Sequence, residues 1–237
     1  MTFESKKRRY IVICVLAATF IAYLLMHIRE SRERAREAAR ANLLRLVRMY
    51  LFDHNSRHSS FPKPVSRDNS GLPLASWRLI IFREERNDPA VDVLKAWNEL
   101  PNLHLVDRGP PMFCRHEDGL EGTNTSVFAI DDLGGPFHVR RKRVPGSTAI
   151  AIWIETSCGH VWSAPGDAQI KEKFLILGTC AIEIDNDLSC LVVFADNEVW
   201  RIQGKQGFEW AFRFADMEYA EKVRRDDDTP SGCVRVK

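Results

Sequence analysis

Two histidines four residues apart, His54 and His58, are side chains that could together bind a metal ion. On a helix this spacing places both imidazoles on one face, as in histidine pairs that bind zinc. Asn55 and Ser56 lie between them, and both residue types favour the end of a helix. We therefore expect the helix to end here and both histidines to be solvated.

A thiol, an imidazole and a carboxylate follow closely in Cys114-Arg115-His116-Glu117. A cysteine activated by a histidine is a common enzymatic nucleophile. Side chains adjacent in sequence seldom point toward one another, so we assign no catalytic site to this segment.

Asp185-Asn186-Asp187 has the acid-x-acid spacing with which type II glycosyltransferases hold a metal and a sugar nucleotide. The same residues are typical of a hairpin turn, and no glycine-rich phosphate loop follows a strand. A membrane-tethered enzyme that uses Asp185 and Asp187 is therefore the alternative, together with a passive carbohydrate- or lipid-binding module. We predict no catalytic, cofactor-binding or metal-binding residues.

The cysteines leave the redox state of the chain open. Cys14 lies in an apolar run, and no pair of cysteines has the C-x-x-C spacing of a zinc knuckle. Disulfides are expected only if the domain lies in an oxidising compartment, and the sequence does not give their connectivity. The five candidates are Cys114, Cys158, Cys180, Cys190 and Cys233.

Residues 10–28, from Tyr10 to Ile28, form an apolar run of 19 residues, and about 20 are needed to cross a bilayer. The run passes directly into Arg29 without a small-residue cleavage site, which predicts an uncleaved anchor. Four basic residues, Lys6 to Arg9, precede it and favour a cytoplasmic N-terminus over residues 1–9. The predicted partner of this segment is the lipid bilayer of the cell (inner) membrane.

A helical continuation is expected over residues 29–55, because Ala, Arg, Glu and Leu dominate and Gly and Pro are absent. Apolar residues at helical spacing predict one face of this helix that packs on a sheet. The members of that stripe are Ala35, Ala39, Leu43, Leu46, Val47 and Tyr50.

From the remaining sequence we predict one α+β domain over residues 56–223 and a flexible tail over residues 224–237. A turn-rich loop opens the domain, a helix is expected over 89–100, and short apolar runs predict antiparallel strands over 125–130, 149–155, 174–177, 181–184, 191–194 and 199–202. The six tryptophans should mostly fill the core. A formal net charge of only +2 gives no reason to expect nucleic acid as a partner.

The order of these landmarks resembles the pseudopilin-like proteins abundant in planctomycete bacteria, a family of unknown function whose N-terminal helix looks like that of type IV pilins and type II secretion pseudopilins. Matching segments run through most of the chain. They are 35–40 and 42–44 on the helix, Tyr50, His54, Ser60-Phe61-Pro62, 71–74, 76–78, Phe113-Cys114, 123–125, 145–148, Glu155, Val161-Trp162, Pro165, Asp167, 194–197 and Val199.

The resemblance implies a pilin-like architecture, with a long helix packed on an antiparallel sheet, and a role in secretion, surface or envelope assembly instead of catalysis. Other pseudopilin-like proteins are the implied partners. The chain departs from pilins at the N-terminus, because Arg9 precedes Tyr10 where pilins have the glycine of the cleavage site, and residues 10–28 contain no carboxylate. Because of these departures, the resemblance does not imply cleavage of the N-terminus or assembly into filaments.

Overall fold

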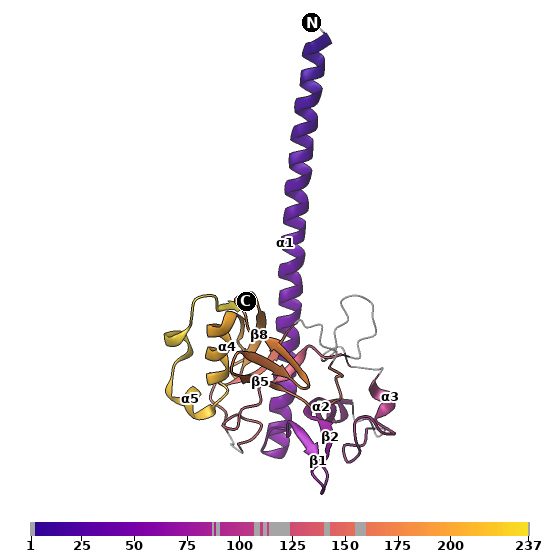
Figure 1. Cartoon of the computed structure of the whole chain (residues 1–237), viewed down its shortest axis with the longest axis vertical. Coiled ribbons are helices and arrows are strands. Elements are labelled where there is room, and N and C mark those ends of the chain that lie inside the picture. Colours follow the sequence, from indigo (N-terminus) through magenta and orange to yellow (C-terminus); the bar gives the residue numbers. More distant parts are fainter. Residues whose placement is uncertain are drawn as a thin grey trace. The chain divides into compact units, whose positions relative to one another are not determined.

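The computed structural model describes residues 3–86, 88, 91–106, 110, 113, 124–139, 143–154 and 160–236, and for residues 3–11 and 228 only the backbone. The chain divides into two units, residues 1–40 and 41–237. The helices, labelled in part in Figure 1, are α1 (Phe3–His58), α2 (Trp77–Arg86), α3 (Leu103–Val106), α4 (Gly204–Arg213), α5 (Met217–Lys222) and the 3₁₀ helix η1 (Arg225–Asp228).

Antiparallel strands make up the rest of the second unit, which confirms the predicted α+β class. The main sheet has the order β10-β9-β8-β4-β3, a smaller sheet has the order β5-β6-β7, and β1 pairs with β2. The strands are β1 (Val65–Arg67), β2 (Pro73–Ser76), β3 (Val127–Ala129), β4 (Ala149–Trp153), β5 (Ala168–Lys171), β6 (Phe174–Leu177), β7 (Cys180–Glu183), β8 (Ser189–Phe194), β9 (Val199–Gln203) and β10 (Val234–Val236).

The main sheet buries both of its faces. Because side chains alternate along a strand, Leu191 and Val193 of β8 join the core cluster that contains α1, whereas Val192 and Phe194 join the cluster that contains α4. The smaller sheet contributes to the second cluster through β5 and β6, for example at Leu175. The main sheet is thus covered by a helix on each side.

The face of α1 that packs on the main sheet is offset from the predicted stripe. Ala41, Leu44, Val47 and Leu51 are at most 1% exposed, and of the predicted stripe only Val47 is buried to this extent. The predicted face is right in part: Val47 is buried and Leu43 and Tyr50 pack against the same core at its edge, whereas Ala35 and Ala39 are exposed because the buried positions begin only at Ala41. The same part of α1 also bonds to the chain after β8, because the guanidinium of Arg48 donates to the backbone carbonyl of Ala195, with Nε 3.0 Å from the oxygen.

Segment 91–100 forms turns in place of the predicted helix. The side chain of Asn102 holds these turns, because its amide nitrogen donates to the carbonyls of Asp92, Lys95 and Ala96 and its oxygen accepts from the Asp92 N–H. Side-chain bonds of this kind satisfy backbone groups that a helix would otherwise pair.

The end of the chain differs from the expected flexible tail. Strand β10 pairs antiparallel with β9, and Arg225 of η1 is only 7% exposed. Its guanidinium lies 4.3 Å from the ring centre of Phe194 and donates to Asp196 at 2.8 Å and to Glu198. The composition of residues 224–237 suggests disorder, but cation–π contacts and charge-assisted hydrogen bonds attach this segment to the main sheet.

Candidate functional site

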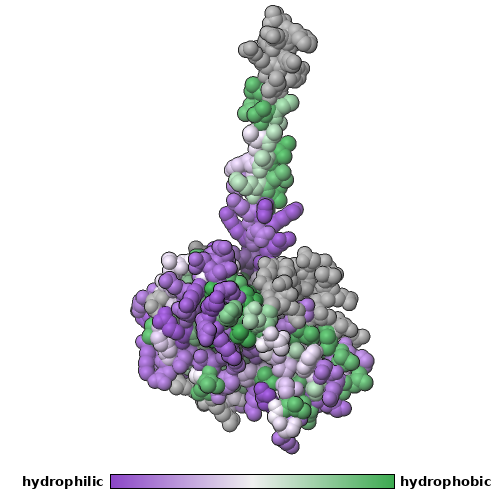
Figure 2. All heavy atoms as spheres, in the orientation of Figure 1, coloured by the Kyte–Doolittle hydropathy of each residue, from purple (hydrophilic) through white to green (hydrophobic). Residues whose placement is uncertain are grey.

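The first candidate region is the apolar part of α1. An 18-residue window of this helix has a mean hydropathy of 2.0 and no buried residues, so it is long and apolar enough to cross a membrane. Leu16, Phe20 and Leu25 are each more than 60% exposed. Figure 2 shows this segment in green and pale colours, followed by the purple charged residues of the next turns. These properties fit a membrane anchor.

The second candidate region is a cluster of three side chains at the junction of α1 and α2, which we call the histidine–glutamate cluster: His54, His58 and Glu84. The carboxylate of Glu84 bridges the two rings. Its Oε2 lies 2.9 Å from Nδ1 of His54, and its Oε1 lies 3.0 Å from Nε2 of His58. The ring centres of the histidines are 4.3 Å apart.

The expectation of two solvated histidines beyond a helix end was wrong, because α1 continues to His58. Ser56 does not end the helix, because its hydroxyl donates to the Asp53 carbonyl one turn earlier, at 2.8 Å. The helix ends at His58, and the next residue, Ser59, has a φ of 57°. His54 is 7% exposed and His58 remains half exposed.

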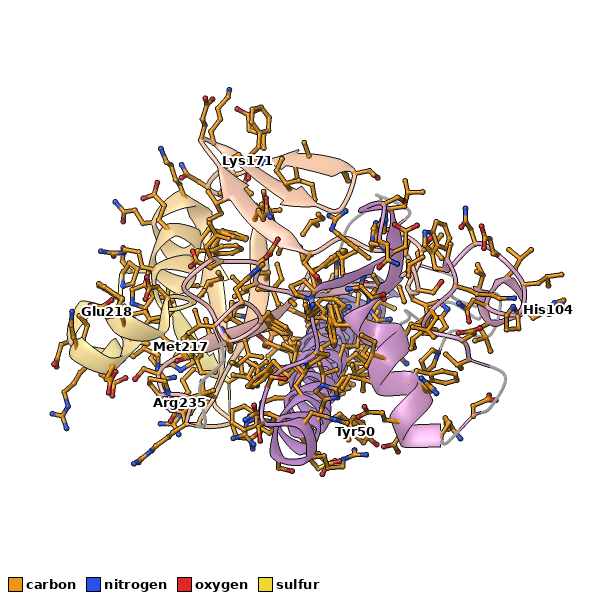
Figure 3. All side chains as sticks on the ribbon, turned by 90° about the horizontal axis from the view of Figure 1, so that it is seen from below. Tyr50, His104, Lys171, Met217, Glu218 and Arg235 are labelled. Atoms are coloured by element: carbon orange, nitrogen blue, oxygen red, sulfur yellow. The ribbon has the colours of Figure 1, made fainter. Side chains whose placement is uncertain are left out.

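Glu84 reaches both histidines because α2 lies beside the last turns of α1. Tyr50 of α1 donates its hydroxyl to Glu85 at 2.8 Å, and Figure 3, in which Tyr50 is labelled, shows the two helices side by side. Burial lowers the pKa of His54, and the neighbouring Glu84 offsets this only in part. His54 is therefore a neutral imidazole at neutral pH, with one ring nitrogen free of a proton. Sequence reasoning missed Glu84, because no local pattern links residue 84 to residue 54.

A third group of polar side chains is buried in the core. The guanidinium of Arg78 is 0% exposed and donates to the carbonyls of Trp162, Val127, Ala164 and Gly166. Its Nη1 also lies 3.3 Å from Oδ1 of Asp167, and this carboxylate is the counterion of the buried guanidinium. Arg78 thus joins α2, β3 and the loop that precedes β5, which is a structural role.

Asp167 and His160 are the titratable neighbours of Arg78. Oδ1 of Asp167 accepts bonds from the Trp77 indole at 2.7 Å and from the Ala129 N–H at 3.0 Å. Burial raises the pKa of Asp167 to about 6 against the opposing effect of Arg78, so the carboxyl is mostly ionised at pH 7. Burial, aided by Arg78, lowers the pKa of His160 to about 4.

The acidic triplet lies between β7 and β8, which belong to different sheets, so it is a connection between sheets and not the predicted hairpin turn. Oδ1 of Asp185 accepts from the backbone N–H groups of Asp187 and Leu188, at 3.0 and 2.8 Å. This Asx turn is sufficient to explain the spacing of the acids.

Among the cysteines, Cys180 is disulfide-bonded, whereas Cys14, Cys190 and Cys233 carry free thiols. Burial raises the pKa of Cys190 well above its usual value, so this thiol is unreactive. Cys114 and Cys158 lie outside the described residues, as do His116 and Glu117 of the segment considered above as a nucleophile.

Comparison of the chain with protein-family models, with curated proteins and with solved structures finds no match. Fold and site together define an α+β protein that has one N-terminal helix apolar and long enough to be a membrane anchor.

Proposed function

We propose that this chain is a single-pass, pseudopilin-like envelope protein, which acts as a non-enzymatic interaction or assembly component of a secretion or surface system. The observation that carries the proposal is the continuity of α1. Its apolar segment is entirely unburied, and the last turns of the same helix pack on an antiparallel sheet in the second unit. This combination is the one that the sequence resemblance to pilins implies.

The orientation follows from two features. The basic residues Lys6 to Arg9 before the apolar segment favour a cytoplasmic N-terminus at the cell membrane. The disulfide at Cys180 supports an oxidising, extracytoplasmic location for the domain, because such bonds are rare in the cytosol. Helix contacts within the bilayer would then bring the chain together with other pseudopilin-like proteins.

Cysteine cross-linking in membranes tests the proposal. Cys14 lies exposed in the apolar segment and carries a free thiol. Treatment of cells with a short, membrane-permeant bis-maleimide should produce adducts between Cys14 and other chains, which mass spectrometry identifies. The proposal predicts partners with an apolar N-terminal helix of their own and the loss of these adducts in Cys14→Ser. Because Cys190 and Cys233 are also free, only adducts that Cys14→Ser removes are counted.

A second measurement tests orientation. Protease added to intact cells should digest the domain only after the outer layers are opened, and should leave the first residues protected. The proposal is overturned if the chain at its native level forms no Cys14-dependent adducts. It is also overturned if the protease reaches the domain only after the cells are lysed.

A further inference from the structure

We propose that the histidine–glutamate cluster binds one divalent transition-metal ion of the zinc type, which fastens the last turn of α1 to α2. His54, His58 and Glu84 each offer one ligand atom, and these atoms all lie within 4.8 Å of one another. The inference concerns the second unit of the chain alone and does not rest on the proposed function.

The geometry of the cluster is close to that of a metal site before an ion enters. In a tetrahedral zinc site with bonds of about 2.0–2.1 Å, neighbouring ligand atoms are separated by roughly 3.3 Å. The carboxylate oxygens of Glu84 already lie 2.9 and 3.0 Å from a ring nitrogen of His54 and of His58. Each ring now contacts a different oxygen of Glu84, and the three ligand atoms lie within 4.8 Å of one another, so shifts of up to about 1.5 Å bring them to the spacing around one ion.

The helix fixes two of the three ligands. His54 and His58 are separated by four residues on a continuous helix, so their side chains share a face by the geometry of the backbone. Because His54 is 7% exposed, packing restricts its ring, whereas the half-exposed His58 opens the cluster to solvent. An ion can enter from the side of His58 and keep a water molecule as its fourth ligand.

The donor set selects the class of ion. Two imidazole nitrogens and one carboxylate suit Zn²⁺, Co²⁺, Ni²⁺ and Cu²⁺, whereas Ca²⁺ and Mg²⁺ prefer sites built from oxygen alone. One charge works against binding, because the guanidinium of Arg57 lies 3.8 Å from Oε2 of Glu84. The paired carboxylate of Asp53 offsets this cation, since Arg57 also donates to Asp53.

The test uses the full chain in detergent after removal of metal with a chelator. Titration with Zn²⁺ followed by calorimetry should show one ion per chain with a dissociation constant in the micromolar range or below. His58→Ala should weaken binding at least tenfold, and Glu84→Gln should do the same. His58 is the preferred variant because its exposed ring contributes little to packing. Thermal unfolding should shift to higher temperature with Zn²⁺ in the wild-type chain and not in His58→Ala.

Two variants serve as matched controls. His104 is exposed on α3, and Figure 3 labels it well apart from Tyr50, so His104→Ala should leave Zn²⁺ affinity unchanged. Arg57→Gln removes the opposing cation and should strengthen binding severalfold, an effect that a purely structural hydrogen-bond cluster would not show. The Co²⁺-loaded chain should have the visible absorption of a tetrahedral site without the near-ultraviolet band of thiolate ligands, which separates this site from the free cysteines.

The proposal is overturned if Zn²⁺ does not bind below about 100 μM, or if the affinity is the same in the wild-type chain, His58→Ala and Glu84→Gln. A thiolate band in the Co²⁺ spectrum would also overturn it, because the ion would then be held by cysteine.

Discussion

At the scale of single residues, the buried ion pair of Arg78 and Asp167 determines how the core is joined. Both side chains are at most 2% exposed, and Arg78, on α2, bonds to carbonyls of two other segments, β3 and the loop that precedes β5. Removal of one member leaves a buried charge without its counterion, which costs more than the pair itself contributes. The domain is therefore destabilised most by a substitution that removes only one of the two charges.

We expect Asp167→Asn and Arg78→Gln each to lower the free energy of unfolding by about 3–5 kcal/mol. The double variant should cost less than the sum of the two, because each single variant leaves the other charge uncompensated. Urea unfolding followed by tryptophan fluorescence measures all three. Lys173→Gln, which breaks an ion pair whose members are both 59% exposed, is the control and should cost less than about 1 kcal/mol. Additive costs at Arg78 and Asp167 would contradict this prediction.

His160 makes the stability of the domain depend on pH. Its pKa is about 4 in the folded chain and about 6.5 when unfolded, so the stability that it contributes is complete above pH 6.5 and is lost as the pH falls toward 4. Asp167 acts in the opposite direction. Its folded pKa of about 6 exceeds the value of 3.8 for the unfolded chain, so its contribution is complete below pH 3.8 and is lost as the pH rises through 6.

His160→Gln removes the His160 contribution and leaves that of Asp167, so the change in unfolding free energy from pH 7 to pH 5 should be more favourable by about 1–2 kcal/mol than in the wild type. Urea midpoints of both proteins at the two pH values measure this difference. The comparison of each protein with itself removes any general cost of the substitution, such as altered packing of the ring against Gly166 and Gly178. An equal change in both proteins would show that His160 is not the titrating group.

At the scale of elements, the attachment of the C-terminal segment can be tested at Arg225. Arg225→Ala removes a guanidinium that contacts two rings and two carboxylates, and we expect it to cost about 2–3 kcal/mol of unfolding free energy. Limited proteolysis should then cut residues 224–237 first. The adjacent, exposed Arg224 provides the matched control, and Arg224→Ala should change neither stability nor the cleavage pattern. A flexible tail would respond equally to both substitutions.

The elements that sequence could predict are those that a local pattern specifies. The apolar runs at 149–155, 174–177 and 191–194 predicted β4, β6 and β8 to within two residues, because short apolar segments bounded by turns have few other solutions. The turn over 195–198 joins β8 and β9 as expected. Patterns failed where distant partners decide, as in α4 and β10, which form because the main sheet offers them a face and an edge.

The same reasoning explains the candidate site. The spacing of His54 and His58 was visible in the sequence, but no local pattern predicts their contacts with Glu84, which is 30 and 26 residues away in the chain. The predicted tryptophan core, by contrast, needed only composition and size. Trp77, Trp162 and Trp210 are 0% exposed.

At the scale of the whole molecule, the apolar segment of α1 should determine where the protein resides. Phe20→Arg places a charge near the middle of that segment, at a cost of about 2.5–3.5 kcal/mol for insertion. A larger share of the chain should then leave the membrane fraction on alkaline carbonate extraction. Ala39→Arg, an exposed position of the same helix outside the apolar segment, should remain in the membrane fraction like the wild-type chain. Identical extraction of both variants would contradict a role of this segment as an anchor.

The helix α1 is synthesised long before the strands of the main sheet on which it packs. Ala41, Leu44 and Leu51 are made early, yet their partners on β8 and β9 leave the ribosome only near the end of the chain. A growing chain therefore displays an uncovered apolar helix face during most of its production. Chains that terminate before β8 lack the surface that covers this face, and quality-control proteases should remove them while sparing the finished protein.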